Sequence, residues 1–410
     1  MDQAKEGAVS ARTGPLQDVR VIDLTQALAG PFCTMLLADL GCDVIKVEPP
    51  RGDMTRGMPP WRGTREEAPY GGYFASINRN KRSIALDLRK NDDLDILFRL
   101  VETADAVVEN SRVGVMDRLG VGYETLRARN PRIVYGAIRG FGDPRTGESP
   151  YAEWPAFDVI AQSMGGIVRL TGPEGSQGYP AGASVGDIYP GTLAALGIVS
   201  AIYRARITGE GQFVDVAMYD GVLALCENLV YQYSFGGREL EPKGRGHAAL
   251  CPFDVFETSD GAVAIAAPTP NHWAVLCGLI GRVDLIDDPR TFENIARLEH
   301  RDIVIDAISA WTKTRTKAQV VAELAGRVPV GPVNTASDIF ADPHVAARGM
   351  LAEIELPETG ERVQIAAPPI HFTQTPAKVY RRPPLLDEHR AEILAEIGVD
   401  PHGHRLEAQT

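Results

Sequence analysis

One aspartate stands out because of the small residues around it. Asp187 lies in the stretch ASVGDIYPGT (183–192), between Gly186 and Gly191 and ahead of Pro190. Glycines have no Cβ, so a bulky carbonyl compound can approach this carboxylate, and their N–H groups can face a developing oxyanion. An ionised carboxylate in such a place can act as a nucleophile. The alternative is a helix cap, a role that Asp commonly has.

A helix is predicted directly after this aspartate. In TLAALGIVSAIYRARITG (192–209) the apolar residues fall at helical spacing, and the pattern places the start of the helix near Pro190 to Thr192. The positive end of such a helix favours a charged neighbour, so we expect Asp187 to be ionised at neutral pH.

Two further groups of polar residues could bind phosphates or an anion. The stretch NRNKRSIALD (78–87) carries Arg79, Lys81 and Arg82 just before a strand pattern, and its alternative interpretation is a solvated basic turn. The stretch VVENSRVGVMDRLG (107–120) ends a strand pattern and then supplies three polar residues, namely Asn110, Arg112 and Arg118. Ligands of open α/β sheets bind beyond the carboxyl ends of strands, although a salt-bridge network in a loop would use the same residues.

The first half of the chain predicts an α/β fold with a Rossmann-like, largely parallel open sheet. Helix patterns at 31–41 and 92–104 alternate with short apolar strand patterns. The strand patterns are VRVIDL (19–24), CDVIKVE (42–48), SIALDL (83–88), DAVVEN (105–110), IVYGAI (133–138) and QFVDVAM (212–218).

The composition of the sequence changes near residue 230, where a connector rich in glycine and charged residues begins. We expect a large domain over 1–230, a smaller α+β domain over 231–327, and a return to the large domain over 328–410. The segment VPVGPVNT (328–335) is interpreted as a strand in the open sheet, and 385–398 as a helix. His402 and His404 fall in a polar tail that we expect to be disordered.

Composition excludes several classes of protein. The chain has 410 residues, 44% of them hydrophobic, and a net charge of -12, so no global basic field draws it to nucleic acid or an anionic membrane. The polar N-terminus has no apolar signal region, which favours a cytoplasmic protein. The five cysteines are scattered without a CxxC pair, so we expect buried thiols rather than disulfides or zinc ligands.

Three familiar site motifs are missing from the sequence. The first strand-to-helix turn, LTQALAGP (24–31), lacks the GxGxxG pattern of dinucleotide-binding proteins. There is no HExxH or His/Cys spacing for a metal and no GxSxG serine elbow. We therefore expect neither a metal nor a tightly bound cofactor.

The ordered set of motifs resembles the family III CoA-transferases. The resemblance covers nearly the whole chain, and it rests on segments that occur in the same order as in the family. These segments are VIDLTQALAGPFCTMLLADLGCDVIKVEPPRGDMTR, NRNKRSIALDL, ADAVVENSRVGVMDRLG, NPRIVYGAIRGFG, GDIYPG, ITGEGQFVDVAMYDGV, VGPVNT and PLLDEH.

The resemblance implies an interlocked, ring-like homodimer that takes acyl-CoA and carboxylic acid substrates. It makes Asp187 the nucleophile, which forms a mixed anhydride and then an aspartyl-CoA thioester. It also implies two groups of CoA-binding residues. Gln26, Ala27 and Ala29 would line the thioester channel, and Lys81, Asn110, Arg118 and Arg139 would hold the phosphates, adenosine end or pantetheine. Pro49 replaces a basic residue that the formyl-CoA members use after the second strand.

Among subfamilies, the sequence is more similar to those that use dicarboxylates. Their donor is succinyl-CoA or a similar thioester, and their acceptors are mesaconate, citramalate, malate, itaconate or glutarate. The segment RGFGDPRTGESPY (139–151) could pair with a second carboxylate through Arg139, Asp143 and Arg145, or form a solvated hairpin. Formyl-CoA members carry a glycine run in the small domain, where this chain has only FGGRE and KGRGH. His247 directly follows the last glycine of KGRGH, and it could touch the acyl group or make a structural hydrogen bond.

Two other functions stay open at this point. An α-methylacyl-CoA racemase on the same scaffold would use an acid and a histidine, but Phe157 stands in the place of that histidine. A non-catalytic nucleotide-binding module would also have a Rossmann-like half and would not need Asp187.

Overall fold

The computed structural model describes residues 12–65, 68–357 and 359–400, and His402 and His404 lie outside these ranges. Within it the chain forms two compact units. The first unit contains the described residues of Met1–Ile167, Ala181–Glu227 and His344–Thr410, and the second contains Val168–Pro180 and Asn228–Pro343. The second unit thus includes 168–180, 228–230 and 328–343, which the sequence-based division gave to the large domain. Contacts alone do not test independent folding, so the domain limits stay a prediction.

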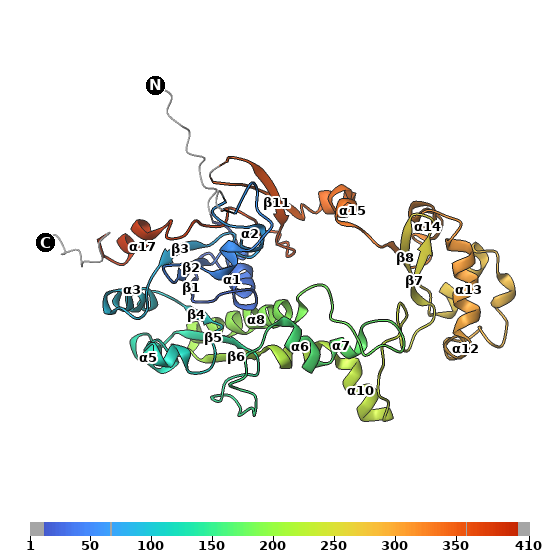
Figure 1. The fold of residues 1–410 in the computed structure, drawn as a ribbon, viewed down its shortest axis with the longest axis horizontal. Helices are drawn as coiled ribbons and strands as arrows, with labels where there is room; N and C mark the ends of the chain where they lie inside the picture. Colours follow the sequence, from blue (N-terminus) through green and yellow to red (C-terminus); the bar gives the residue numbers. More distant parts are fainter. Residues whose placement is uncertain (1–11, 66–67, 358, 401–410) are drawn as a thin grey trace, which may run out of the picture. The chain divides into compact units, whose positions relative to one another are not determined.

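The first unit is built on a six-stranded parallel sheet, which confirms the predicted α/β class (Figure 1). The order in the sheet is β3-β2-β1-β4-β5-β6. The strands are β1 (Arg20–Asp23), β2 (Asp43–Glu48), β3 (Arg82–Ala85), β4 (Ala106–Glu109), β5 (Val134–Arg139) and β6 (Phe213–Ala217). Because the order reverses between β1 and β4, the loops that leave these two strands border a crevice at their carboxyl ends.

Helices cover both faces of this sheet. Gly136 of β5 lies against Ile198 of the helix at 185–208, whereas its neighbours Tyr135 and Ala137 belong to a separate apolar cluster with the helices at 91–102, 123–129 and 390–396. The helices of the unit include α1 (Ala29–Asp39), α2 (Gly72–Ile77), α3 (Asn91–Glu102), α4 (Val115–Arg118), α5 (Tyr123–Arg129), α6 (Asp158–Gly165), α8 (Val185–Thr208), α9 (Met218–Leu225) and α17 (Arg390–Glu396). The 3-10 helix η1 (Met54–Gly57) and the hairpin of β10 (Leu351–Glu355) and β11 (Arg362–Ala366) complete it.

Helix α8 begins earlier than the sequence predicted. It starts at Val185, so Asp187 lies in its first turn and Pro190 lies inside the helix. The predicted start near Pro190 was wrong because the N–H groups of Val185 and Gly186 find acceptors outside the helix, in the carbonyl of Ala183 and the carboxylate of Asp158. This helix is long and apolar enough to cross a membrane. Its packing against α1, α9 and strands β5 and β6 accounts for that composition.

The second unit contains a three-stranded antiparallel sheet of β7 (Phe253–Thr258), β8 (Gly261–Ala266) and β9 (Val330–Pro332). The predicted hairpin of the first two strands is confirmed. The expectation that 328–335 returns to the open sheet was wrong, because β9 pairs with β8. The helices here are α10 (Glu227–Gly236), α11 (Pro270–Leu279), α12 (Asn294–Glu299), α13 (Arg301–Thr312), α14 (Lys317–Leu324) and α15 (Ala336–Ala341), with η2 (Val283–Leu285). At the boundaries lie α7 (Ile167–Leu170) and α16 (Pro343–Ala347).

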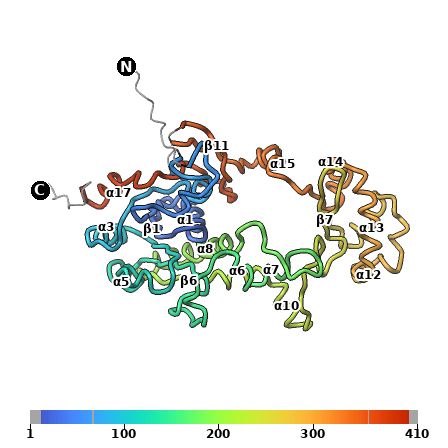
Figure 2. Tube along the Cα trace, in the orientation of Figure 1, coloured from blue at the N-terminus to red at the C-terminus, as the bar shows by residue number. Residues whose placement is uncertain are grey.

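The C-terminal segment lies beside the N-terminal part of the first unit (Figure 2). Asn80 joins the two, with a left-handed φ of 65° and almost no exposed surface. Its Nδ2 donates to the carbonyl of Lys378 and to Asp39, and its Oδ1 accepts from the N–H groups of Tyr380 and Arg381. The side chain of Asn80 therefore binds the backbone of residues 378–381 as a neighbouring strand would. All five cysteines of the chain are buried and free, as predicted.

We predict that Asn80→Gly frees the segment 378–381 while keeping the left-handed backbone. The lost hydrogen bonds cost roughly 1–3 kcal/mol for each buried group left unpaired, so hydrogen exchange in this segment becomes faster. Asn80→Ala should be about 1 kcal/mol worse, because alanine also strains a positive φ. Exchange measured by mass spectrometry tests this, and unchanged protection in Asn80→Gly would contradict it.

Candidate active site

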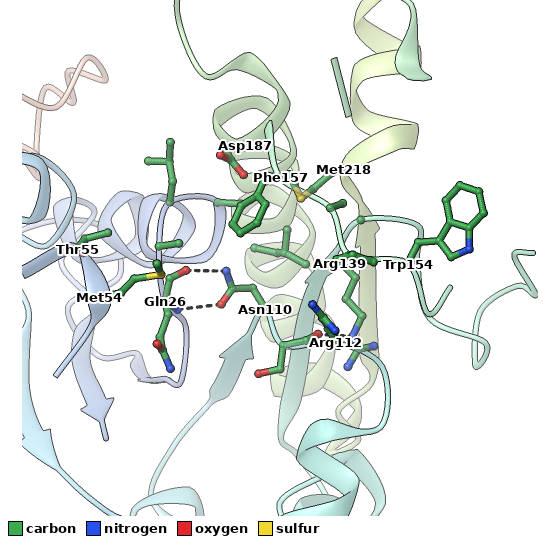
Figure 3. Close-up of a pocket in the computed structure, with 18 of the residues that line it drawn as sticks. Gln26, Met54, Thr55, Asn110, Arg112, Arg139, Trp154, Phe157, Asp187 and Met218 are labelled. Carbon is green, nitrogen blue, oxygen red and sulfur yellow. Dashed lines mark hydrogen bonds between the residues drawn. The ribbon is translucent and has the colours of Figure 1, made fainter. Parts of the chain in front are cut away.

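A cavity of about 410 Å³ opens at the crevice between the carboxyl ends of β1 and β4 (Figure 3). Six predicted site residues line it: Gln26, Ala27, Ala29, Asn110, Arg139 and Asp187. They come from the turn after β1, the start of α1, the loop after β4, the end of β5 and the first turn of α8. The structure therefore brings together residues that are up to 161 positions apart in the sequence, as the span from Gln26 to Asp187 shows.

The turn after β1 is held by a side chain from β4's loop. Oδ1 of Asn110 accepts from the N–H of Gln26 at 2.9 Å, and its Nδ2 donates to the carbonyl of Gln26 at 2.7 Å. Both bonds are drawn in Figure 3. The next residue, Ala27, has a left-handed φ of 66°, a costly conformation for alanine that this pairing stabilises. The carboxamide of Asn110 is thus engaged by backbone and shapes the cavity wall.

Beneath this turn lies a buried group of charged side chains. Asp23 accepts from Thr34 and from the ammonium of Lys81, which also donates to the carbonyl of Pro31 and to Asn78. Lys81 has no exposed surface and is not among the residues that line the cavity. The expected phosphate contact therefore does not fit its place in the structure, because its three N–H donors are already used inside the protein.

Asp187 points into the cavity from the first turn of α8 (Figure 3). Within the described part of the chain, no hydrogen bond or ion pair involves its carboxylate. Burial, and after it the charge of Asp158, raises the pKa of Asp187 to about 7. The expectation of a fully ionised carboxylate at neutral pH thus needs correction. The N–H of Gly186 donates to Asp158, so it is not free to face an oxyanion as the sequence suggested.

The predicted arginines differ in whether protein groups already bind their guanidinium groups. Arg139 lines the cavity, but its guanidinium donates to Glu109, Asp143 and the carbonyl of Ser111. Arg112 also lines the cavity, is exposed, and has no ion pair among the residues that the structure describes. Of the two arginines that the described residues contribute to this wall, it is the one without an acidic partner. Arg118 is exposed on α4 and does not line the cavity.

Two residues of the 139–151 segment are occupied elsewhere. Asp143 accepts from Arg139, and Arg145 pairs with Asp143 and Asp117. Neither Asp143 nor Arg145 lines the cavity, so the structure offers no support for their pairing with a substrate carboxylate. In the second unit, the ring of His247 accepts a hydrogen bond from the N–H of Ala249. This is the structural hydrogen bond that the sequence allowed as the alternative to contact with the acyl group.

The sequence missed several residues that line the cavity, notably Tyr73 of α2, Met54 of η1 and Trp154. They lie in segments with no spacing pattern, so only the folded chain shows that they meet. Phe157, which stands in the place of a racemase histidine, lines the cavity too. No group of three or more His, Cys, Asp or Glu side chains in the described ranges is placed to hold a metal ion.

A second hollow of about 440 Å³ adjoins the first. Both are lined by Leu24, Gln26 and Ser111, and the second continues along the carboxyl ends of β2 and β3. Pro49 and Arg51 line it. The position of Pro49 is therefore close to a ligand-sized space, with an arginine two residues later.

Comparison with known proteins gives a consistent likeness. Residues 16–390 match the family described as CoA-transferase family III. The chain is 47% identical over 395 residues to the succinyl-CoA:mesaconate CoA-transferase of Haloarcula hispanica, covering 96% of this chain and 99% of the relative. It is 37% identical over 390 residues to the succinate–glutarate CoA-transferase of Agrobacterium fabrum, covering 94% and 96%. A crystal structure of a CAIB/BAIF family protein from Brucella suis is 37% identical with a TM-score of 0.82, covering 94% of this chain and 100% of that one.

We predict that Asn110→Ala loosens the turn after β1. The backbone N–H and carbonyl of Gln26 lose their partners, which costs roughly 1–3 kcal/mol, so affinity for CoA should fall by about tenfold or more. Hydrogen exchange at residues 26–28 and CoA titration calorimetry measure the two effects. Gln26→Ala is the control, because it keeps the backbone pair and should leave exchange slow. Unchanged exchange in Asn110→Ala would sink this assignment.

We also predict that Asp187→Asn stabilises the protein at alkaline pH. The pKa of Asp187 is raised from about 4 to about 7, so the ionised carboxylate destabilises the fold. This destabilisation grows between these two pH values and is constant above 7. At pH 8.5 the gain in unfolding free energy should be on the order of 3 kcal/mol, and it should shrink towards pH 5. Denaturant titrations at both pH values test this, and an equal gain at both would contradict it.

Proposed function

Because this chain belongs to CoA-transferase family III, we propose that it moves CoA from a dicarboxylyl-CoA thioester to a second dicarboxylate through covalent intermediates on Asp187. The observation that carries the proposal is the state of this carboxylate. It points into a cavity, it has no hydrogen bond within the described residues, and its pKa is raised to about 7. A bare, basic carboxylate is a better nucleophile than a solvated one.

The first half of the reaction transfers the acyl group and then CoA. An oxygen of Asp187 attacks the thioester carbonyl, the C–O bond forms, the C–S bond breaks, and CoA leaves as its thiolate. The thiolate attacks the side-chain carbonyl of the resulting mixed anhydride, and the donor acid leaves as its carboxylate. An aspartyl-CoA thioester remains on the protein.

The second half repeats these steps in reverse. The acceptor carboxylate attacks the aspartyl thioester and releases the CoA thiolate, and the thiolate then attacks the acceptor acyl carbon. Asp187 leaves as a carboxylate. One thioester is exchanged for another, so no ATP is consumed and no net proton is taken up.

The cavity supports this chemistry in two ways. Its wall includes the apolar side chains of Trp154, Phe157 and Met218, which limit the polar groups that would face a hydrolysable anhydride. The free guanidinium of Arg112 supplies positive charge for an anionic group of CoA or of the acid. The adjoining hollow near Arg51 gives the nucleotide end of CoA a place beyond the strands.

The substrate class rests on the named relatives together with the site. Those relatives act on succinyl-CoA with mesaconate and on succinate with glutarate, so we propose a short dicarboxylate of this kind as acceptor. A racemase is less well supported, because Phe157 cannot exchange a proton at the position where that reaction needs a base.

A homodimer and a cytoplasmic location belong to the same proposal. Three large apolar side chains of α8 are mostly exposed in the single chain: Leu196 (66%), Tyr203 (70%) and Ile207 (63%). We propose that a second copy buries these side chains, since exposed apolar groups on one helix are typical of an interface. Light scattering on the purified protein measures the assembly.

The deciding experiment is a mass-spectrometric trap. Protein is incubated with succinyl-CoA, treated with hydroxylamine or borohydride, digested, and searched for the peptide that contains Asp187. We expect modification at Asp187 in the wild type only when CoA ester is present, and none in Asp187→Asn. Asp187→Asn should still bind CoA, and its turnover should fall by at least about 10³-fold. Turnover of this variant at the wild-type rate would contradict the role of Asp187. A wild-type protein that binds CoA but shows neither turnover nor modification of Asp187 would instead favour a binding module.

Acylation of Asp187 should depend on pH with a midpoint near 7. Only the ionised carboxylate attacks, and burial raises its pKa to about 7, so the rate should be constant at higher pH and fall about tenfold per unit well below the midpoint. Single-turnover release of CoA thiol at saturating thioester measures this rate. A rate that stays constant down to pH 5 would contradict the raised pKa.

A further inference from the structure

The N-terminus of α6 packs directly on the first turn of α8, where the nucleophile lies. Oδ1 of Asp158 accepts from the N–H of Gly186 at 2.8 Å, and its Oδ2 accepts from Nε2 of Gln162, also at 2.8 Å. Oε1 of Gln162 in turn accepts from the N–H of Ala181. The carboxylate of Asp158 is therefore oriented at both oxygens.

The two helices approach so closely that only glycine fits at the contact. A Cβ on Gly186 would lie 2.6 Å from the carbonyl oxygen of Asp158 and 3.2 Å from the Cβ of Ala161. The glycine before the nucleophile thus serves the packing of α6 on α8. This fixes the Asp158 carboxylate directly beside the turn that carries Asp187.

The donors of the first turn of α8 are all used. The N–H of Val185 donates to Ala183, and those of Asp187 and Ile188 donate to the carbonyl of Ser184. The fourth, from Gly186, donates to Asp158. None is left for the side chain of Asp187, although the positive end of a helix would otherwise stabilise its anion.

Other titratable groups on the packed elements do not offset this arrangement. Tyr73 on α2 and the buried thiol of Cys33 on α1 are neutral near pH 7, since burial raises the pKa of each. Arg139 on β5 is bound by two carboxylates, and the charges of β6 and α9 are the acids Asp215 and Asp220. Asp158 is the neighbouring charge that acts on Asp187.

We propose that Asp158 is a positioning residue that holds the first turn of α8, occupies its positive end with a negative charge, and so keeps Asp187 free of hydrogen bonds. The inference rests on the proposed nucleophilic role of Asp187. It assigns to Asp158 a share in the rate of attack although this residue is not among those that line the cavity.

The test is the pH profile of Asp187 acylation in Asp158→Asn. Asparagine keeps an oxygen that accepts from Gly186 but removes the charge, so the midpoint should fall by about one pH unit. The plateau rate should fall by roughly two- to threefold, because the ionised Asp187 becomes a weaker base. Asp158→Ser, whose hydroxyl can accept the same N–H, should shift it likewise if the asparagine variant does not fold. Gln162→Leu is the matched control: it removes the second hydrogen bond but keeps the charge, so its midpoint should stay that of the wild type.

The outcomes separate this inference from the proposed function. If wild-type Asp187 is acylated and the folded Asp158 variants keep its midpoint, the role of Asp158 is overturned and the transferase mechanism stands. If Gln162→Leu shifts the midpoint as far as Asp158→Asn, helix packing rather than charge is responsible, and the inference also fails. If wild-type Asp187 is never acylated, the proposed function fails first and this inference falls with it.

Discussion

The buried carboxylate of Asp23 is the interaction on which the arrangement of the site depends. It has no exposed surface and accepts from the N–H of Thr25, the hydroxyl of Thr34 and the ammonium of Lys81. Burial alone would raise its pKa, but Lys81 and Lys46 outweigh burial and hold that pKa at about 2. A permanently charged group at the end of β1 thus ties this strand to α1 and to the start of β3, and the turn between β1 and α1 has little freedom left.

This device explains how a Rossmann-like turn works without its usual glycines. Glycines let a backbone wrap closely around a pyrophosphate at a helix N-terminus. Here the ammonium of buried Lys46 donates to the carbonyl of Thr25, and the carboxamide of Asn110 pairs with the backbone of Gln26. Side chains therefore impose the left-handed Ala27 that glycine would otherwise supply. The turn becomes one wall of the cavity that Asp187 also lines.

Much of the large unit could be predicted from the sequence because its strands are short, apolar and separated by helix patterns, which is the signal that parallel α/β folds give. Asn110 could be expected near the crevice because it follows a strand, and it lines the cavity together with Gln26, which the family resemblance indicated. The orientation of a long side chain did not, because a basic turn before a strand looks the same whether its lysine points out or in. Lys81 therefore was expected on a phosphate and is found on Asp23. Pairing partners of isolated strands such as β9 depend on distant residues and were missed for that reason.

A carboxylate nucleophile must be both basic and ionised, and a change in its pKa improves one property at the expense of the other. An ordinary carboxylate is fully ionised at pH 7 but weakly basic, and one with a much higher pKa would be protonated and inert. The useful pKa lies near the working pH, where both factors are adequate. In this chain the raised pKa of Asp187 comes from burial and from Asp158, both of which cost stability in the free protein. In the proposed mechanism an acyl group on Asp187 would remove this charge and its cost, so the fold would favour the covalent state.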